Sequence, residues 1–104
     1  MIFAVAVVKF CRSLPHTVEG NVFRYQLLKA GTSVGANYRA TCRGRSNAEK
    51  RAKLGVVIEE ADESEYWLLL LERSTLGDPT QRSALLKEAG ELTALFVSCR
   101  RSMP

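Results

Sequence analysis

The chain has 104 residues, of which 46% are hydrophobic and 25% charged, and this balance is typical of one globular domain spanning residues 1–104. Fifteen Lys and Arg residues against eleven Asp and Glu give a formal net charge of +4, which favours an anionic partner only modestly. The three cysteines, Cys11, Cys42 and Cys99, have no CxxC spacing, which argues against a zinc site or a disulfide framework and indicates a reducing cytoplasm.

The first predicted helix covers residues 2–13 and is ended by Pro15, because the residue before a proline avoids the helical conformation. Its apolar run is too short to span a bilayer and lacks the positive lead-in of a signal peptide, so we expect no membrane contact. The residues at helical spacing that we expect to face the core are Val5, Val8 and either Cys11 or Arg12.

The second element contains the stretch "KAGTSVGANYRA", residues 29–40, whose glycines and small polar residues are typical of a loop. A phosphate-binding P-loop would need four residues between its glycines, then Lys followed by Ser or Thr, and this stretch has neither. Helical spacing instead continues through the glycines, and it predicts one helix from Val18 to about Arg43 with Thr17 as N-cap. The residues that keep this spacing are Phe23, Leu27, Ala30, Val34, Tyr38 and Thr41.

Two further patterns lie on this helix. Gly31 and Gly35 are four residues apart on one face, which favours the close approach of another helix and offsets their cost of about 1 kcal/mol each. Gln26, Ser33 and Asn37 form a polar line, which is either a buried polar seam that fixes the register of the bundle or a solvated face.

The third helix begins with a capping box, because Ser46 lies three residues before Glu49. Gly77 suits the C′ position at its end, and Asp78 and Pro79 suit the N-cap and first residue of a fourth helix that frays after residue 99. The residues expected in the core are Leu54, Val57, Ile58, Ala61, Leu68 and Leu71 on the third helix, and Leu85, Leu86, Ala89, Leu92, Leu95, Phe96 and Cys99 on the fourth. Four helices with short connections predict an all-α fold, an antiparallel up-down-up-down four-helix bundle with a short first helix.

Charge is distributed unevenly along this predicted bundle. Antiparallel pairing of the second and third helices places Lys29 beside Ala61 and Arg39 level with Arg51. The acids at residues 59–65 therefore have basic neighbours, whereas the bases at residues 39–53 have no acidic neighbours on the paired helix. The fourth helix returns to the same end. The predicted basic end therefore contains Arg39, Arg43, Arg45, Lys50, Arg51, Lys53, Arg100 and Arg101.

The first helix should begin only about level with Gly31, so a groove is expected to stay open toward the basic end. We expect this end to contact a phosphate backbone; the alternatives are a solvated end, or arginines that pair with acids of a neighbouring subunit. A dimetal site is not expected, because bundles build it from Glu-x-x-His pairs and the only histidine, His16, lies in a turn. No other cofactor and no catalytic residues are indicated.

The run "YWLLLL", residues 66–71, places large apolar side chains all around the third helix, more than one core-facing stripe can bury. Trp67 and Leu70 are therefore the candidate residues for an interface between subunits, unless the first and fourth helices cover them.

The stretches "YQLLKAGTSVGANYRATCRGRS" and "KLGVVIEEADESEYWLLLL" resemble bacterial four-helix bundle proteins. These are related to the proteins encoded in intervening sequences of large-subunit ribosomal RNA genes and to the accessory variability protein of diversity-generating retroelements. The resemblance implies a homopentameric ring without enzymatic activity, and the retroelement relative implies RNA, DNA or a reverse transcriptase as partner. Lys50 and Arg51 depart from the family, which usually carries an aromatic residue there, and they strengthen the local positive charge.

From these observations we expect a non-enzymatic, oligomeric binding or scaffold protein of the bacterial cytoplasm that contacts nucleic acid through its basic end. The alternative is a protein–protein interaction module that binds no nucleic acid and whose basic end pairs with an acidic partner.

Overall fold

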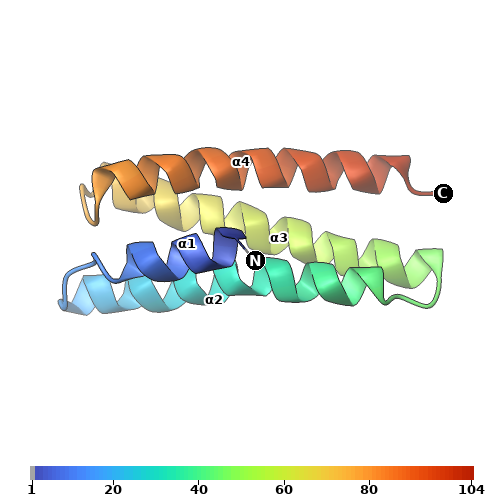
Figure 1. Cartoon of the computed structure of the whole chain (residues 1–104), viewed down its shortest axis with the longest axis horizontal. Coiled ribbons are helices and arrows are strands. Elements are labelled where there is room, and N and C mark those ends of the chain that lie inside the picture. The colour runs from blue at the N-terminus through green and yellow to red at the C-terminus, as the bar shows by residue number, and fades with distance from the viewer. Residues whose placement is uncertain (1) are drawn as a thin grey trace.

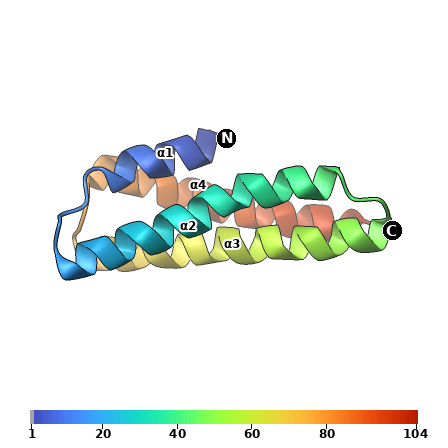
Figure 2. The same ribbon diagram turned by 90° about the horizontal axis from the view of Figure 1, so that it is seen from below.

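The computed structural model describes residues 2–104, which form an antiparallel bundle of four helices and contain no strand. The helices are α1 (Ile2–Cys11), α2 (Val18–Cys42), α3 (Asn47–Arg73) and α4 (Pro79–Ser102), and their bundle measures 45 × 19 × 19 Å. Figures 1 and 2 show that α1 accompanies α2 for only part of its length. The predicted all-α bundle with a short first helix is therefore confirmed, and the stretch "KAGTSVGANYRA" is helical.

Three side chains fix the starts of the helices that follow α1. The Thr17 hydroxyl accepts a hydrogen bond from the Gly20 N–H (3.1 Å), and the Ser46 hydroxyl accepts one from the Glu49 N–H (3.1 Å). The Asp78 carboxylate accepts from the Gln81 N–H (2.9 Å), with Pro79 following it in the first helical position. Each satisfies a backbone donor that the helix itself leaves unpaired, which confirms the three predicted N-caps.

The end of α3 differs from the sequence-based expectation. The Leu76 N–H donates to Leu71 O (3.0 Å) and the Thr75 N–H to Glu72 O (3.1 Å), the two bonds of a Schellman motif, so Thr75 occupies the C′ position predicted for Gly77. Thr75 has φ 53° and Gly77 has φ 81°, so both lie in the left-handed region. A Cβ on Gly77 would lie 2.6 Å from the Phe10 ring, so glycine is required there for space as well as for conformation.

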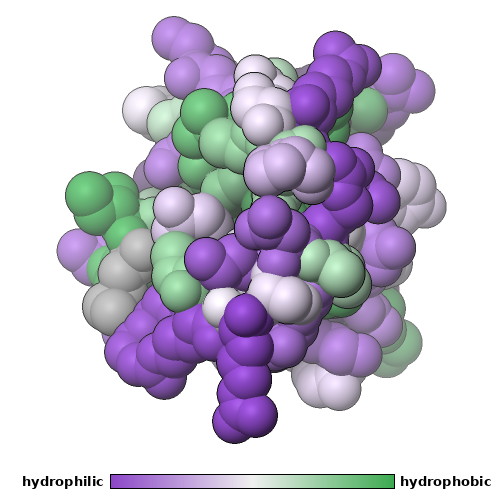
Figure 3. Space-filling model, turned by 90° about the vertical axis from the view of Figure 1, so that its right-hand side faces the viewer, coloured by the Kyte–Doolittle hydropathy of each residue, from purple (hydrophilic) through white to green (hydrophobic). Residues whose placement is uncertain are grey.

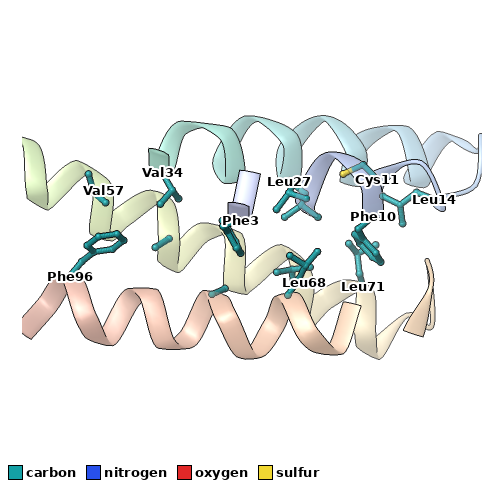
Figure 4. Close-up of a cluster of buried hydrophobic side chains, with 14 of the residues drawn as sticks. Phe3, Phe10, Cys11, Leu14, Leu27, Val34, Val57, Leu68, Leu71 and Phe96 are labelled. Carbon is teal, nitrogen blue, oxygen red and sulfur yellow. The ribbon is translucent and has the colours of Figure 1, made fainter. Parts of the chain in front are cut away.

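The core runs along the bundle axis, and α1 enters it through a different stripe from the one predicted (Figure 4). Phe3, Val7 and Phe10 are buried together with the predicted Cys11, whereas Val5 is 46% exposed. Because α1 is apolar at every position except Lys9, hydrophobic spacing alone does not distinguish its faces. The bulkier phenylalanines take the core positions.

Three other residues predicted to face the core are exposed. Tyr38 on α2, and Leu95 and Cys99 on α4, lie beyond the N-terminal end of α1. The physical reason is the length of α1, since no described helix covers these side chains.

At the opposite end, two guanidinium groups hold the connections. Arg24 on α2 donates to Leu14 O (2.7 Å), Pro15 O (3.2 Å) and Cys11 O (3.4 Å), which caps the C-terminal end of α1. Arg82 on α4 is buried and donates to Leu76 O (2.8 Å) in the α3–α4 connection. No helix in residues 2–104 is long and apolar enough to cross a membrane.

Candidate nucleic-acid interface

The α2–α3 turn and the C-terminal end of α4 lie at the same end of the bundle (Figure 1). The eight predicted basic residues therefore belong to one end of the molecule, on three helices and one turn. Viewed end-on, this surface is mostly hydrophilic with smaller hydrophobic areas between (Figure 3).

Arg51, Arg100 and Arg101 line one depression of about 330 Å³ between α3 and α4, together with Ile58 and Val97. Its lining contains no acidic residue. A Cβ added to Gly55 would lie 3.6 Å from an Arg100 guanidinium nitrogen, so the bare backbone of α3 provides the surface along which Arg100 extends. The sequence predicted that these arginines share one end, and the structure adds that they share one depression.

Arg51 also has a structural role. Its guanidinium donates to Met103 O at 3.0 Å, which holds the C-terminal end of α4 against α3. Arg51 is accordingly half-buried, whereas Arg100 and Arg101 are exposed. Exchange of Arg51 would disturb the fold as well as the charge, so Arg100 and Arg101 are the better positions for testing the surface.

The remaining predicted bases surround the α2–α3 turn. Arg39, Arg43 and Arg45 are exposed. The Lys50 side chain packs over Gly44, where a Cβ would lie 2.5 Å from its Cγ. Lys53 forms an ion pair with the Glu49 carboxylate (3.7 Å). Of the predicted capping box, only the hydrogen bond from the Glu49 N–H to the Ser46 hydroxyl is present.

Within residues 2–104, Lys53 is the one member of the basic set that has a carboxylate within 4.0 Å. The guanidinium donors of the arginines are thus directed at water or at backbone carbonyls. A planar guanidinium matches the oxygens of a phosphate group through two parallel hydrogen bonds, so this end is chemically suited to a phosphate backbone.

The two glycines of α2 have different surroundings. A Cβ on Gly31 would lie 2.9 Å from both Val7 methyl groups, so Gly31 allows the close packing of α1 that the sequence predicted. Within residues 2–104, and apart from the neighbouring backbone of α2 itself, no atom lies within 4 Å of the corresponding position on Gly35. Close helix approach is therefore present at Gly31, whereas no described helix packs closely on Gly35.

The polar line on α2 makes its hydrogen bonds within its own helix. The Ser33 hydroxyl donates to Lys29 O (2.6 Å) and the Asn37 amide donates to Ser33 O (2.8 Å). Both side chains, and that of Gln26, are half-buried. These two bonds stay within α2, so they provide no contact with another helix that would fix the register of the bundle.

The candidate interface residues on α3 are half-buried. The Trp67 ring packs against Phe23 at a centroid distance of 6.2 Å and its indole N–H donates to Glu63 (3.2 Å). Leu70 is likewise half-buried, whereas their neighbours Tyr66 and Leu69 are 60% and 37% exposed.

Cys11 and Glu60, which lie outside the basic end, have shifted pKa values. Burial raises the pKa of the Cys11 thiol to about 11, so this cysteine is inert at neutral pH. Burial and the neighbouring Glu63 raise the pKa of Glu60, partly opposed by Lys29, which lies beside this part of α3 as the predicted hairpin requires. Among the described residues no group of three His, Cys, Asp or Glu side chains is arranged to hold a metal ion, and His16 is exposed in the α1–α2 connection.

A second recess lies between α2 and α4, beside the N-terminal end of α1. The sequence predicted an open groove there from the length of α1 and did not identify its lining. The recess measures about 120 Å³ and is lined by Phe3, Ala4, Gly31, Val34, Gly35, Tyr38, Leu92 and Phe96. The sequence could have indicated this recess, because Val34 and Tyr38 keep helical spacing on a predicted helix longer than the first one, and Phe96 lies on another such helix.

Comparison with known proteins bears on this geometry. The family model described as 23S rRNA-intervening sequence protein matches residues 1–98. The chain belongs to this family. It also resembles a crystal structure from Bacteroides thetaiotaomicron, described as a protein with unknown function from the S23 ribosomal protein family. The two chains are 33% identical and superimpose with a TM-score of 0.88, covering 97% of this chain and 94% of the other.

The family resemblance seen in the sequence is therefore confirmed over nearly the whole chain. No curated protein matches this member of the 23S rRNA-intervening sequence protein family. Neither the family description nor that of the Bacteroides protein names a catalytic activity.

Proposed function

We propose that the protein is a non-enzymatic binding protein of the bacterial cytoplasm that contacts the phosphate backbone of RNA or DNA through its basic end. The observation that carries this proposal is the α3–α4 depression, where three arginines converge without an acidic residue in the lining. The unpaired cysteines Cys11, Cys42 and Cys99 suit a reducing compartment.

The contact is expected to depend on charge more than on sequence. The depression offers guanidinium groups over the apolar side chains of Ile58 and Val97, a combination suited to a backbone and its sugars. Each phosphate contact releases counterions, so the logarithm of affinity should fall linearly with the logarithm of salt concentration.

The test compares two variants with the same change in net charge. Arg100→Ala/Arg101→Ala removes two exposed bases from the depression, whereas Arg12→Ala/Arg73→Ala removes two exposed arginines from the other end of the bundle. Fluorescence anisotropy with labelled single-stranded RNA, duplex RNA and duplex DNA should show weaker binding for the first variant only, with a salt slope smaller by about 0.7–0.9 for each phosphate that is no longer neutralised. Equal weakening in both variants, or no binding at low salt, would contradict the proposal.

The same experiment separates the second candidate function, a protein-interaction module. The exposed apolar side chains Tyr66 and Leu69 favour contact with another protein surface, including a second copy of the chain or a reverse transcriptase. A protein that binds none of the three nucleic acids yet forms oligomers would support this alternative.

A further inference from the structure

A third depression lies between α1 and α2, beside the connection that joins them. This connection is at the end of the bundle opposite to the basic end (Figure 1). The depression measures about 300 Å³, which is at the lower end of the size range of small-molecule sites. All of its lining comes from residues 8–28, so the site is complete within one helical hairpin. The lining residues are Val8, Cys11, Arg12, His16, Arg24 and Leu28.

Arg24 provides a positive charge that is held in place without being neutralised. Its guanidinium donates to Leu14 O (2.7 Å) and to Asn21 Oδ1 (2.7 Å). Two longer bonds reach Pro15 O (3.2 Å) and Cys11 O (3.4 Å). All four acceptors are uncharged, and the Arg24 side chain is half-buried. An anion in the depression would therefore give this guanidinium a charged partner, which residues 2–104 do not supply.

The charge of Arg24 reaches the lining of the depression. Burial raises the pKa of the Cys11 thiol to about 11, and Arg24 partly opposes this rise. An arginine that favours the thiolate form of Cys11 would favour any other negative group at the same position.

Arg12 and His16 add further donors at the rim. Both side chains are exposed, and within residues 2–104 neither has a carboxylate within 4.0 Å. The one acidic residue in residues 1–28 is Glu19, which does not line the depression. The rim therefore offers N–H donors and the positive charge of Arg12 without a competing carboxylate.

The floor between these polar groups is apolar. Val8 of α1 and Leu28 of α2 are half-buried, and Cys11 is buried and acts as a small apolar group. An inorganic ion would leave this floor in contact with water, whereas a molecule with an apolar body would cover it. The depression is thus suited to a ligand that combines an anionic group with an apolar body.

We propose that the depression between α1 and α2 binds a small organic anion, a carboxylate on a short apolar chain. The planar guanidinium of Arg12 donates two parallel hydrogen bonds to the carboxylate, and the fixed charge of Arg24 lies beside it. The chain lies on Val8 and Leu28. At about 30 Å³ for each water-sized group, the depression holds about ten such groups, which is the size of octanoate.

The experiment follows the amide resonances of the isotope-labelled full chain during titration with octanoate. Butyrate tests the apolar chain, and octylammonium, which carries the opposite charge, tests the head group. Arg12→Glu reverses the charge at the rim. Arg73→Glu, at an exposed position of the same end but outside the depression, is the matched variant. Circular dichroism checks that both variants are folded, and Arg12→Gln replaces Arg12→Glu if the charge reversal unfolds the chain.

We expect octanoate to shift amide resonances within residues 8–28, with equal affinity for the natural chain and Arg73→Glu. Arg12→Glu should weaken binding at least about tenfold, because a charge-assisted hydrogen bond is lost and the new carboxylate repels the ligand. Butyrate should bind at least about tenfold more weakly than octanoate, since each buried methylene contributes about fourfold. Octylammonium should not bind in the depression.

Each of the following results would overturn the inference. Octanoate that causes no shifts at millimolar concentration, or shifts only outside residues 8–28, removes the depression as the site. Equal octanoate affinity of the natural chain and Arg12→Glu, or equal binding of octylammonium, removes the anion contact. Equal affinities of octanoate and butyrate remove the apolar contact.

This inference does not rest on the nucleic-acid contact, which lies at the other end of the bundle. Arg100→Ala/Arg101→Ala should bind octanoate as the natural chain does, whereas its nucleic-acid binding should be weaker. The two proposals can therefore fail separately.

Discussion

The same residue type serves opposite purposes at Gly31 and Gly35 because their surroundings differ. Both lie inside the continuous helix α2, four residues apart, and each costs the helix about 1 kcal/mol relative to alanine. Gly31 offsets that cost by letting Val7 pack against the helix backbone, whereas no side chain in residues 2–104 packs within 4 Å of the Cβ position of Gly35. The sequence shows the spacing of the two glycines, but it does not show which atoms of other helices lie beside each of them.

Alanine at these two positions should therefore have opposite effects on stability. Gly35→Ala should stabilise the chain by about 1 kcal/mol, the gain in helix propensity. Gly31→Ala should destabilise it, because its Cβ would overlap the buried Val7 methyl groups at a cost of about 1–3 kcal/mol against the same gain. Urea unfolding followed by circular dichroism measures both. Equal shifts in the two variants would show that α1 does not pack on Gly31 in solution.

The N-terminal boundaries of α2, α3 and α4 were the most predictable feature of the elements, whereas the residue that ends α3 was not. Thr17, Ser46 and Asp78 cap helices as expected, because the capping hydrogen bonds are local and depend on side chains a few residues apart. The face of α1 and the surroundings of the Gly35 recess were not predictable in detail. Both depend on contacts between helices, and α1 has Lys9 as its single charged residue to orient it.

α1 is attached to the bundle partly by a side chain from another element. Arg24 of α2 satisfies carbonyl oxygens of Cys11, Leu14 and Pro15 at the point where α1 ends. Arg24→Ala should lower the free energy of unfolding by about 2 kcal/mol, because these acceptors lose a charged donor in a partly buried site. Arg12→Ala, at an exposed position on the same connection, is the control and should change the value by less than about 0.5 kcal/mol. Thermal and urea unfolding of both variants measure the difference, and equal stabilities would contradict this role for Arg24.

At the scale of the whole molecule, fold and family followed from the sequence, whereas the surface chemistry required the structure. The eight bases were assigned to one end correctly from helix lengths and direction. Their division into an α3–α4 depression and a turn cluster was not predictable, because it depends on the rotation of each helix about its axis.

Self-association is the remaining property that we propose for the whole molecule. Tyr66 and Leu69 expose apolar surface on α3 next to the predicted interface residues Trp67 and Leu70. Native mass spectrometry should detect one discrete oligomer, for which the family resemblance implies a pentamer. Leu69→Glu should dissociate it without unfolding the protomer, whereas Val18→Glu, at an 82% exposed position on α2, should leave it assembled. A monomer at micromolar concentration would contradict the proposal.

The scarcity of ion pairs within the bundle has a practical consequence. Residues 2–104 contain one ion pair, Lys53 with Glu49, and it lies on the surface. The buried guanidinium of Arg82 is held by backbone carbonyls, which carry no charge for added ions to screen. Ionic strength should therefore have little influence on whether the chain is folded. Where circular dichroism shows the fold constant across the range, a salt titration of a complex formed by this protein reports on the contact surface.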